Sequence, residues 1–441
     1  MKHIIQFVKQ LFPNTHPIRL LFHKVKGVTA AVLYGFPARK LKVIGVTGTD
    51  GKSTTTSIIA QLLTLSGKKV GMASTVMFQI GDRVWTNTTH KTTLSPFGLQ
   101  KLLRQMVDAG CTHAVIETSS HALIQSRVWG IPYSTGVFTN LAREHLDYHH
   151  TMDEYFLAKK KLFEKVSQLK SGKRVFVLNG NDTYSQKLIS LSTDVCYVFG
   201  RETLPEFSQE VQKVVAKNIQ ITDMGQAFDL QLPSGQVRRC ETTLIGLFNI
   251  DNILAALITA HEEGIPFEKL CDLLPKVHSV PGRMEKVIAG QDFQVIIDYA
   301  VTPQALEKCY RTLRAQTKGQ LVALLGACGD RDKGKRKEMG FLATSLCDSV
   351  IFTNEESYTE DPKTILSMLV SGAEEEGRGN YKIIEERRDA LRYAIRNAHP
   401  GDVLVITGMG DQTSMVIGNT MVPWSDREVA REEIISYLAH K

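Results

Sequence analysis

A glycine-rich segment at residues 47–54 carries the residue types needed to hold a nucleoside triphosphate. It reads Thr-Gly-Thr-Asp-Gly-Lys-Ser-Thr, follows an apolar run and precedes apolar residues with helical spacing. Such a strand–loop–helix turn directs backbone N–H groups and a helix N-terminus at one point, while Lys52 supplies positive charge and Ser53 a hydroxyl for magnesium. Because Val46 stands where the standard spacing has glycine, we interpret the segment as a variant phosphate loop. An ordinary glycine-rich turn is the alternative.

Polar residues also follow two later apolar runs. Glu117-Thr-Ser-Ser-His121 comes directly after one run, and the ends of the strands carry the ligand site in open parallel sheets. A carboxylate near the phosphate loop would suit magnesium, although the same segment also reads as a helix-capping cluster. Residues 139–150 contain three histidines, which are either metal ligands or part of a solvated loop.

A second glycine-rich loop is expected at residues 326–336. It contains Lys333, Lys335 and Arg336 together with Arg331 and two aspartates. Its basic groups would suit phosphate, and a plain surface turn is the alternative, since exposed Lys and Arg are common in loops.

Strand-like apolar runs alternate with helical spacing from residue 41 onward, which predicts an α/β fold with mainly parallel sheets. Turn residues at 281–283 interrupt the pattern before it begins again. We therefore expect a basic N-terminal extension (1–40), a central P-loop-type ATPase domain (41–280) and a smaller C-terminal Rossmann-like domain (281–441). The polar, alternating region at about 196–243 is interpreted as a small antiparallel insertion. The expected strands are 42–46, 70–73, 113–117, 135–139, 174–179, 294–298, 320–326, 349–353, 381–385 and 402–407, and helices are expected at 97–109, 152–168 and 248–263.

Charge and cysteine usage narrow the class of protein. The chain has 441 residues and a net charge of +7, but the seven Lys and Arg residues of segment 1–40, which has no Asp or Glu, account for all of it. The neutral remainder gives no case for nucleic-acid binding. The seven cysteines form no Cys-x-x-Cys pair, which argues against a zinc cluster or a disulfide framework and favours a cytoplasmic protein. No apolar stretch near the start is long enough to span a bilayer. No sequence pattern indicates the oligomeric state, and a monomer is the default expectation.

The basic N-terminal extension contains a candidate amphipathic helix. Ile18, Leu21, Phe22, Val25 and Val32 fall roughly on one helical face, with basic residues elsewhere. Packing on the main domain is the expected role, and weak contact with a membrane surface or a partner is the alternative.

Taken together, the motifs resemble the Mur ligase superfamily, and most closely its MurE-type members, the UDP-N-acetylmuramoyl-dipeptide:amino-acid ligases. The resemblance covers about residues 41–410, in the family's order. The matching motifs are Thr47-Gly-Thr-Asp-Gly-Lys-Ser53, Glu117-Thr-Ser-Ser-His-Ala-Leu123, Thr139-Asn-Leu-Ala-Arg-Glu-His-Leu-Asp-Tyr-His149, Tyr155-Phe-Leu-Ala-Lys159, Gly246-Leu-Phe-Asn-Ile-Asp-Asn252, Pro281-Gly-Arg283, Asp298-Tyr-Ala300 and Gly329-Asp-Arg-Asp-Lys-Gly-Lys-Arg336.

The resemblance implies an ATP- and Mg²⁺-dependent amide ligase and a role for each matching residue. Lys52, Glu117, His145 and Lys159 would be catalytic. Ser53, Glu117, His145 and Lys159 would bind Mg²⁺, with Lys159 matching the lysine that the family carbamylates. Residues expected to bind ATP are Gly48, Thr49, Asp50, Gly51, Lys52, Ser53, Thr54, Asn140, Asn252, Arg283, Asp298 and Lys333. Residues expected to bind the other substrates are Thr92, Thr93, Ser119, His121, Arg127, Glu355, Glu356 and Tyr358.

The sequence also departs from the MurE-type pattern. Only about forty residues precede the phosphate loop, where such enzymes usually carry a uridine-binding domain. The uridine end would then be held differently, a partner would supply the missing contacts, or the acceptor is not a UDP-sugar. Diaminopimelate-adding members have Asp-Asn-Pro-Arg where this chain has Glu355-Glu-Ser-Tyr358, and paired glutamates favour a cationic group over a carboxylate. A lysine-like diamine is therefore the hypothesis for the added amino acid, and exposed surface glutamates are the alternative.

The function expected from the sequence is the ATP-dependent addition of an amino acid to a UDP-MurNAc-dipeptide-like acceptor through an acyl phosphate, in peptidoglycan synthesis. Two alternatives stay open. One is a related ligase acting on another acid, of the folylpolyglutamate, polyglutamate or lipid-linked cell-wall type. The other is a nucleotide-binding subunit without catalytic activity. The expected partners are small-molecule substrates, with neither nucleic acid nor a transmembrane segment.

Overall fold

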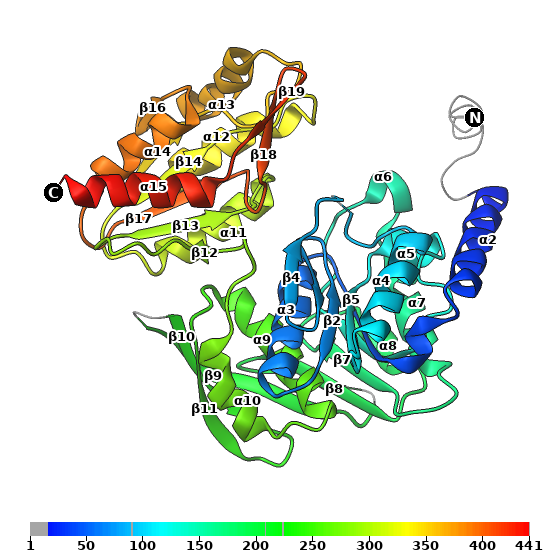
Figure 1. Cartoon of the computed structure of the whole chain (residues 1–441). Coiled ribbons are helices and arrows are strands. Elements are labelled where there is room, and N and C mark those ends of the chain that lie inside the picture. The colour runs from blue at the N-terminus through cyan, green and yellow to red at the C-terminus, as the bar shows by residue number, and fades with distance from the viewer. Residues whose placement is uncertain (1–15, 90, 208, 223–224, 441) are drawn as a thin grey trace. The chain divides into compact units, whose positions relative to one another are not determined.

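The computed structural model describes residues 16–440 except 90, 208 and 223–224. The chain divides into two compact units between His278 and Ser279. Each unit is an α/β structure built on its own sheet (Figure 1). The predicted fold class, a large and mainly parallel sheet followed by a smaller α/β domain, is confirmed.

The first unit is built on an 11-stranded sheet in the order β11-β10-β9-β8-β7-β6-β1-β5-β2-β3-β4. Within the series from β9 to β2, each strand is parallel to the next. The bounds of the strands are β1 Lys42–Thr47, β2 Val70–Ala73, β3 Met77–Ile80, β4 Arg83–Thr86, β5 His113–Glu117, β6 Tyr133–Phe138, β7 Val175–Asn179, β8 Val195–Arg201, β9 Gln212–Thr222, β10 Gly225–Gln231 and β11 Val237–Thr242. Central strands such as β5 and β7 are apolar and fully buried, as expected for parallel strands covered on both faces.

The antiparallel pairing predicted within the region at 196–243 is confirmed for β9, β10 and β11, but these strands extend the main sheet instead of forming an insertion. Strand β8 is parallel to both β7 and β9, whereas β9, β10 and β11 pair in antiparallel fashion at one edge of the same sheet. The apolar side chains of this edge, such as Phe228 and Leu230, join the core that contains Ile44 of β1. The alternating pattern therefore marks strands with one face on the main core.

Helices cover both faces of this sheet (Figure 1). On one face, α3 (Lys52–Leu65), α9 (Leu247–Glu262) and α10 (Phe267–Leu273) share a core with the strands. On the other face lie α4 (Pro96–Asp108), α5 (Ser120–Ile124), α7 (Met152–Ser167) and α8 (Ser185–Ile189). A short helix, α6 (Leu146–His149), precedes α7. This arrangement places the loops after β1, β5 and β6 at the same edge, because these three strands are adjacent and parallel.

The N-terminal helix predicted from the sequence is present as α2 (Pro17–Leu33). It packs on the unit through its small residues Gly27, Ala30 and Ala31, which are buried. The apolar residues that were expected to form its packing face are exposed instead, because the small residues on the opposite side allow the closer approach. Residues 1–15 of the predicted extension lie outside the described residues.

The second unit contains a six-stranded sheet in the order β12-β13-β17-β14-β15-β16, parallel except for the pair β12 and β13. The strands are β12 Glu285–Lys286, β13 Gln294–Asp298, β14 Leu321–Leu325, β15 Ser349–Phe352, β16 Tyr381–Ile383 and β17 Val403–Thr407, with a separate hairpin of β18 Ser414–Ile417 and β19 Thr420–Pro423. The helices are α11 Pro303–Arg314, α12 Gly334–Leu346, α13 Pro362–Glu376, α14 Arg387–Arg396 and α15 Asp426–Ala439. Helices α14 and α15 share a core with the sheet.

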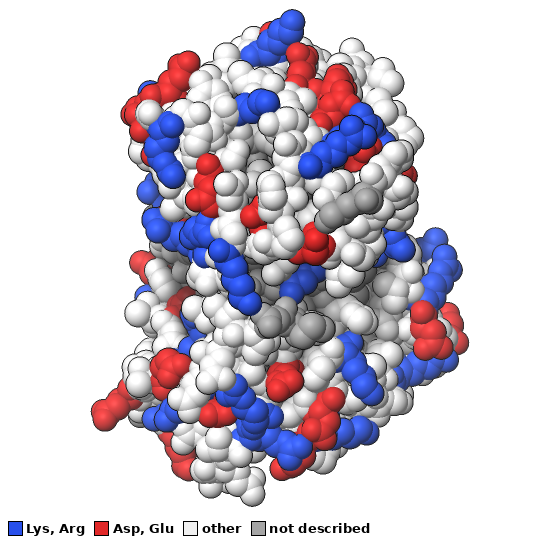
Figure 2. All heavy atoms as spheres, turned by 90° about the vertical axis from the view of Figure 1, so that its left-hand side faces the viewer, with Lys and Arg blue, Asp and Glu red and all other residues white. Residues whose placement is uncertain are grey.

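Two surface properties bear on the classes of partner. No described helix combines the length and the apolar character needed to cross a membrane. On the face shown in Figure 2, Lys and Arg side chains are interspersed with Asp and Glu. That mixture is the usual one for a protein surface.

Candidate functional site

The predicted phosphate loop forms the turn between β1 and α3 in the first unit. Gly51 adopts a left-handed conformation (φ 79°) immediately before α3, and a β-carbon on it would collide with Oδ1 of Asn252. A β-carbon on Gly48 would collide with Oγ1 of Thr139, in the loop after β6. Both positions therefore need glycine for packing, because the loop is in close contact with Thr139 on one side and with Asn252 on the other.

Asn140 fixes the shape of the loop. Its backbone oxygen accepts from the N–H of Thr49 (2.9 Å), its Oδ1 accepts from the N–H of Asp50 (2.9 Å), and its Nδ2 donates to the carbonyl of Asp50 (3.2 Å). These bonds occupy the backbone N–H groups of Thr49 and Asp50, which are then not available to a ligand. The first turn of α3, which begins at Lys52, has N–H groups without partners inside the helix, so it is the part of the loop that can offer donors to an anion.

Two lysines converge on the carbonyl groups of the same loop. Lys52 Nζ donates to the carbonyl of Thr49 (2.6 Å), and Lys159 Nζ, from α7, donates to the carbonyl of Gly48 (2.5 Å). Lys159 is buried, and its Nζ lies 4.2 Å from the centre of the Tyr155 ring. Burial, followed by repulsion from Lys52, holds the pKa of Lys159 well below its ordinary value, so the neutral amine is favoured there.

Glu117 at the end of β5 connects the loop with the turn after β2. It accepts from Ser53 Oγ (3.0 Å), from the N–H of Thr75 (2.7 Å) and from Thr75 Oγ1 (2.9 Å). Ser53 and Glu117 form a pair of hard oxygen donors beside the phosphate loop. Among the described residues no group of three His, Cys, Asp or Glu side chains comes close enough to hold a metal. A pair of oxygens suits Mg²⁺, which keeps several waters and takes further ligands from nucleotide phosphates.

His145 and His149, which follow β6, form a cluster of rings with His121 of α5 rather than a metal triad. The His121 ring lies 4.9 Å from that of His145 and 5.4 Å from that of His149. His149 Nε2 is 2.9 Å from Ser120 Oγ. His145 is a partly exposed residue with positive φ (55°), and in the described part of the chain it makes no hydrogen bond or ion pair with Ser53 or Glu117. Its role as a metal ligand stays a prediction.

Most of the predicted substrate residues of the first unit belong to one hydrogen-bond network beside Glu117. Thr93 Oγ1 donates to the carbonyl of Glu117 (2.9 Å) and accepts from the N–H of Ser119 (3.0 Å). Arg127 donates to the carbonyl of Thr93 (2.9 Å) and to Gln125 Oε1. Thr92 is the half-buried neighbour of this network. The guanidinium of Arg127 thus holds the segment around Thr93.

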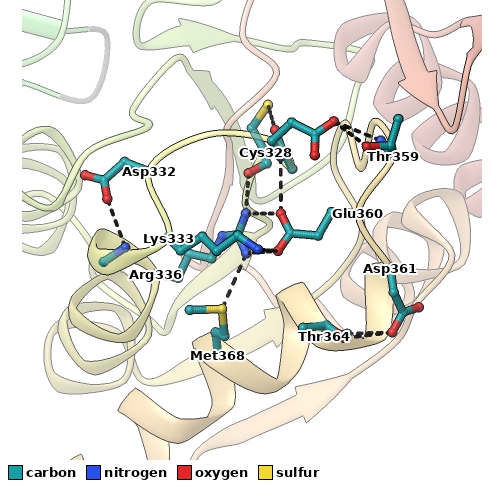
Figure 3. A network of polar contacts seen from close by, with 12 residues as sticks. Cys328, Asp332, Lys333, Arg336, Thr359, Glu360, Asp361, Thr364 and Met368 are labelled. Carbon is teal, nitrogen blue, oxygen red and sulfur yellow. Dashed lines mark hydrogen bonds and ion pairs between the residues drawn. The ribbon is translucent and has the colours of Figure 1, made fainter.

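In the second unit, the predicted nucleotide contacts are engaged within the unit. Lys333 forms an ion pair with Glu360 (2.9 Å), and the fully buried Arg336 donates to both carboxylate oxygens of Glu360, as Figure 3 shows. Glu360 therefore anchors the loop at 328–336. The Arg283 guanidinium lies 4.7 Å from the ring centre of Tyr299, and Asp298 accepts from the N–H of Met284 (2.8 Å).

The predicted amino-acid pocket contains a buried carboxylate. Glu355, at 6% exposure, forms neither a hydrogen bond nor an ion pair in the described part of the chain, and its carboxylate fills the space that a β-carbon on Gly408 would need. Burial raises the pKa of Glu355 to about 7, with Arg387 opposing and Asp426 and Glu356 adding to the shift. Glu356 is also buried and accepts from the Tyr358 hydroxyl (3.4 Å).

Comparison with known proteins identifies the family. Residues 46–260 match the Mur ligase middle domain, and residues 282–410 match the Mur ligase, glutamate ligase domain. A UDP-N-acetylmuramoyl-L-alanyl-D-glutamate–2,6-diaminopimelate ligase of Geobacillus kaustophilus (strain HTA426) is 40% identical over 415 residues, which cover 93% of this chain and 82% of that relative. The chain belongs to the Mur ligase family.

Two solved structures show how far the likeness extends. The structure of a UDP-N-acetylmuramoyl-L-alanyl-D-glutamate–2,6-diaminopimelate ligase matches with a TM-score of 0.67 and 32% identity, over 91% of this Mur ligase and 79% of that chain. Folylpolyglutamate synthase of Mycobacterium tuberculosis, complexed with ADP and AMPPCP, matches with a TM-score of 0.65 and 19% identity, over 87% of this chain and 92% of that one. The second likeness is one of fold alone.

Sequence reasoning missed three residues of the site in this Mur ligase. Thr75 bonds both oxygens of Glu117, Tyr155 lies between Lys159 and the histidine rings, and Gly408 makes room for Glu355. Tyr155 stands in a stretch that was compared with a family motif, but no local pattern gave Tyr155 or Gly408 a role. Thr75 carries no local signal, because its contact depends on how β2 and β5 pair.

Thr75 offers a test of how Glu117 is positioned. We expect Thr75→Val to weaken the activation of ATP turnover by Mg²⁺ about tenfold, because Glu117 loses the bond from Oγ1 while keeping the one from the backbone N–H. A Mg²⁺ titration of phosphate release measures the effect. Thr86→Val, at an exposed position of β4, is the matched control. Equal Mg²⁺ requirements for both variants would contradict a positioning role for Thr75.

Proposed function

We propose that this Mur ligase adds an amino acid to a UDP-N-acetylmuramoyl-L-alanyl-D-glutamate-type acceptor, with ATP as the energy source, in the synthesis of cell-wall peptides. The observation that carries the proposal is the 40% identity over 415 residues to a ligase named for that acceptor. The proposal is also supported by the hydrogen bonds that connect Ser53 with Glu117 and Lys159 with the phosphate loop, because an ATP-dependent ligase needs these groups close together.

The chemistry proceeds in two steps. An oxygen of the acceptor carboxylate attacks the γ-phosphorus of ATP, the bond to the bridging oxygen breaks, and ADP leaves. The amine nitrogen of the incoming amino acid then attacks the carbonyl carbon of the acyl phosphate, and the tetrahedral intermediate expels phosphate while the nitrogen loses a proton. Both steps transfer or release a highly charged group, so positioning and positive charge are the main contributions that the protein can make.

The first unit supplies the phosphate and metal contacts in this proposal. The first turn of α3 and Lys52 would hold the phosphates, and Ser53 and Glu117 would hold Mg²⁺. Bound Mg²⁺ would neutralise charge on the transferred phosphoryl group. To reach a phosphate, Lys52 would have to exchange its present bond to the carbonyl of Thr49 for one to the ligand. Asn252, Arg283, Asp298 and Lys333 are proposed as further nucleotide contacts.

Lys159 is proposed to act as a carbamate. The lone pair of a neutral amine attacks CO₂, an N–C bond forms as one C=O π bond breaks, and the nitrogen releases a proton, which leaves an anionic carbamate. The lowered pKa of Lys159 favours the neutral amine that this reaction needs. Carbamylation also replaces a cation that is repelled by Lys52 with an anion that Lys52 attracts, and it supplies an oxygen ligand for Mg²⁺.

For the added amino acid, the proposal names a diamine of the lysine type. In the described part of the chain, the buried Glu355 has no cationic partner in hydrogen-bond contact, and Glu356 lies next to it in sequence and is buried as well. An ammonium group placed beside these carboxylates would compensate the burial that raises the pKa of Glu355. A cytoplasmic location is part of the proposal, since ATP is a cytoplasmic substrate and all seven cysteines are free thiols.

The experiment that tests the function measures phosphate release and product mass together. Purified protein is incubated with ATP, Mg²⁺ and UDP-N-acetylmuramoyl-L-alanyl-D-glutamate, with L-lysine, L-ornithine, meso-diaminopimelate, L-norleucine or L-alanine in separate reactions. We expect turnover and a mass gain of one residue with lysine or ornithine. Turnover with diaminopimelate alone would contradict the assignment of the amino acid, and no turnover with any of them would contradict the acceptor.

A second acceptor class is tested in the same assay, because the fold is shared with folylpolyglutamate synthase. Replacing the UDP-linked dipeptide by a pteroyl glutamate, with glutamate as the amine, should give no product. The 40% identity to the diaminopimelate ligase favours the cell-wall acceptor over this alternative.

A further inference from the structure

Helix α2 presents an apolar stripe to solvent. The side chains involved are large and are between 53% and 68% exposed: Ile18, Leu21, Phe22, Val25, Val32 and Leu33. Five of them recur at the spacing i, i+3, i+4, i+7 and i+14, which places them on one face of a helix with about 3.6 residues per turn. Large apolar side chains that gather on one exposed face, rather than scattering singly, indicate a place where something binds.

The stripe points away from the unit that carries it. The opposite face of α2 holds Gly27, Ala30 and Ala31, which are buried against the protein; a β-carbon on Gly27 would meet the backbone oxygen of Ser126 and Trp129 Cβ. Figure 1 shows α2 at the margin of the first unit, where it contacts α4. The helix is thus fixed by its small residues, while the other described residues leave its large apolar side chains exposed.

Basic residues border the stripe on both sides. At about 100° per residue, Arg19 and Lys26 fall along one border and Lys24 along the other. The Lys26 ammonium lies 4.2 Å from the ring centre of Phe22, so its aliphatic stem runs along the apolar surface while the charge stays at its edge. Residues 1–40 contain seven Lys and Arg and no Asp or Glu.

We propose that α2 is an interfacial helix that binds the surface of a bilayer containing anionic lipids. The apolar stripe would enter the boundary between headgroups and acyl chains, and the bordering cations would meet the lipid phosphates. A second copy of the chain fits this surface less well: in a symmetric pairing of two α2 helices, cations would face cations with no carboxylate of residues 16–40 to pair with them. This inference is independent of the reaction proposed above.

The test is co-sedimentation of the full chain with vesicles. We expect binding to vesicles of phosphatidylcholine with 30% phosphatidylglycerol, about tenfold weaker binding to pure phosphatidylcholine, and weakening by salt. The double variant Leu21→Asp/Phe22→Asp should lose at least about tenfold in partitioning, and so should Lys24→Glu/Lys26→Glu. These positions are exposed, so the variants should fold, and their unchanged ligase activity with soluble substrates would establish that they do.

Val237→Asp is the matched control, because Val237 is an exposed apolar residue of β11 that is 62% accessible and far from α2 in sequence. It should bind vesicles like the wild type. Equal sedimentation of the wild type and the Leu21→Asp/Phe22→Asp variant, or no binding of the wild type to anionic vesicles, would overturn the proposal. Self-association that disappears in the same double variant, without vesicle binding, would assign the stripe to a second copy instead.

Discussion

Replacing Lys159 with alanine is expected to reduce amide formation by about a hundredfold to a thousandfold, because the change removes the proposed anionic carbamate, a ligand for Mg²⁺ at the site of phosphoryl transfer. Lys159 is buried, donates to the carbonyl of Gly48 in the phosphate loop and has a strongly lowered pKa. Phosphate release in the presence of all substrates measures the effect. Lys161→Ala, at an exposed position of the same helix, is the control and should keep wild-type activity.

The proposed carbamylation of Lys159 can be tested separately from the need for a lysine at this position. Wild-type activity should fall in buffer depleted of CO₂ and return when bicarbonate is added, and ¹³C-bicarbonate should give a carbamate resonance that is absent from Lys159→Ala. Full activity of the alanine variant would remove Lys159 from the mechanism. Loss of activity in that variant, together with no CO₂ dependence and no carbamate signal in the wild type, would leave the lysine acting as an amine and contradict carbamylation.

Replacing Glu355 with glutamine is expected to reduce kcat/KM for a lysine-type substrate by about tenfold to a hundredfold, because an ammonium loses its charged partner. The wild-type value should also rise as pH increases through about 7, where Glu355 ionises, and the variant should lack that rise. The sign follows from the raised pKa. Glu355 contributes fully to the free energy of unfolding below the ordinary pKa of a glutamate, where it is protonated, and this contribution is lost as pH rises through about 7 and the buried carboxylate ionises. A bound ammonium group therefore compensates the most negative charge at high pH.

Two comparisons isolate the charge at Glu355. Norleucine has the shape of lysine without the ammonium, so its poor use by the wild type should not change in Glu355→Gln. Glu374→Gln, at an exposed position of α13, should behave like the wild type. An unchanged preference for lysine over norleucine in Glu355→Gln would show that Glu355 does not recognise the cation.

The fold class could be predicted because each central strand of a parallel sheet is a short apolar run that the sequence displays directly. Strands such as β5 and β13 have the predicted bounds, His113–Glu117 and Gln294–Asp298. The place of the region at 196–243 was harder to predict from the sequence. An alternating pattern indicates that one face of a strand is buried, but it does not indicate which core that face joins. Its apolar side joins the core of α3 and α9, and therefore the main sheet.

The sequence by itself determined the phosphate loop and the family, because glycine, lysine and serine at fixed spacing act through local backbone geometry. Tertiary structure decided what depends on distant segments meeting. The pairing of β2 with β5 brings Thr75 to Glu117, the loop after β15 brings Glu360 to Lys333, and Gly408 makes room for the buried Glu355. For α2, spacing predicted an apolar face, but only packing settled that the small residues turn inward, since Gly27 and two alanines allow the closer approach.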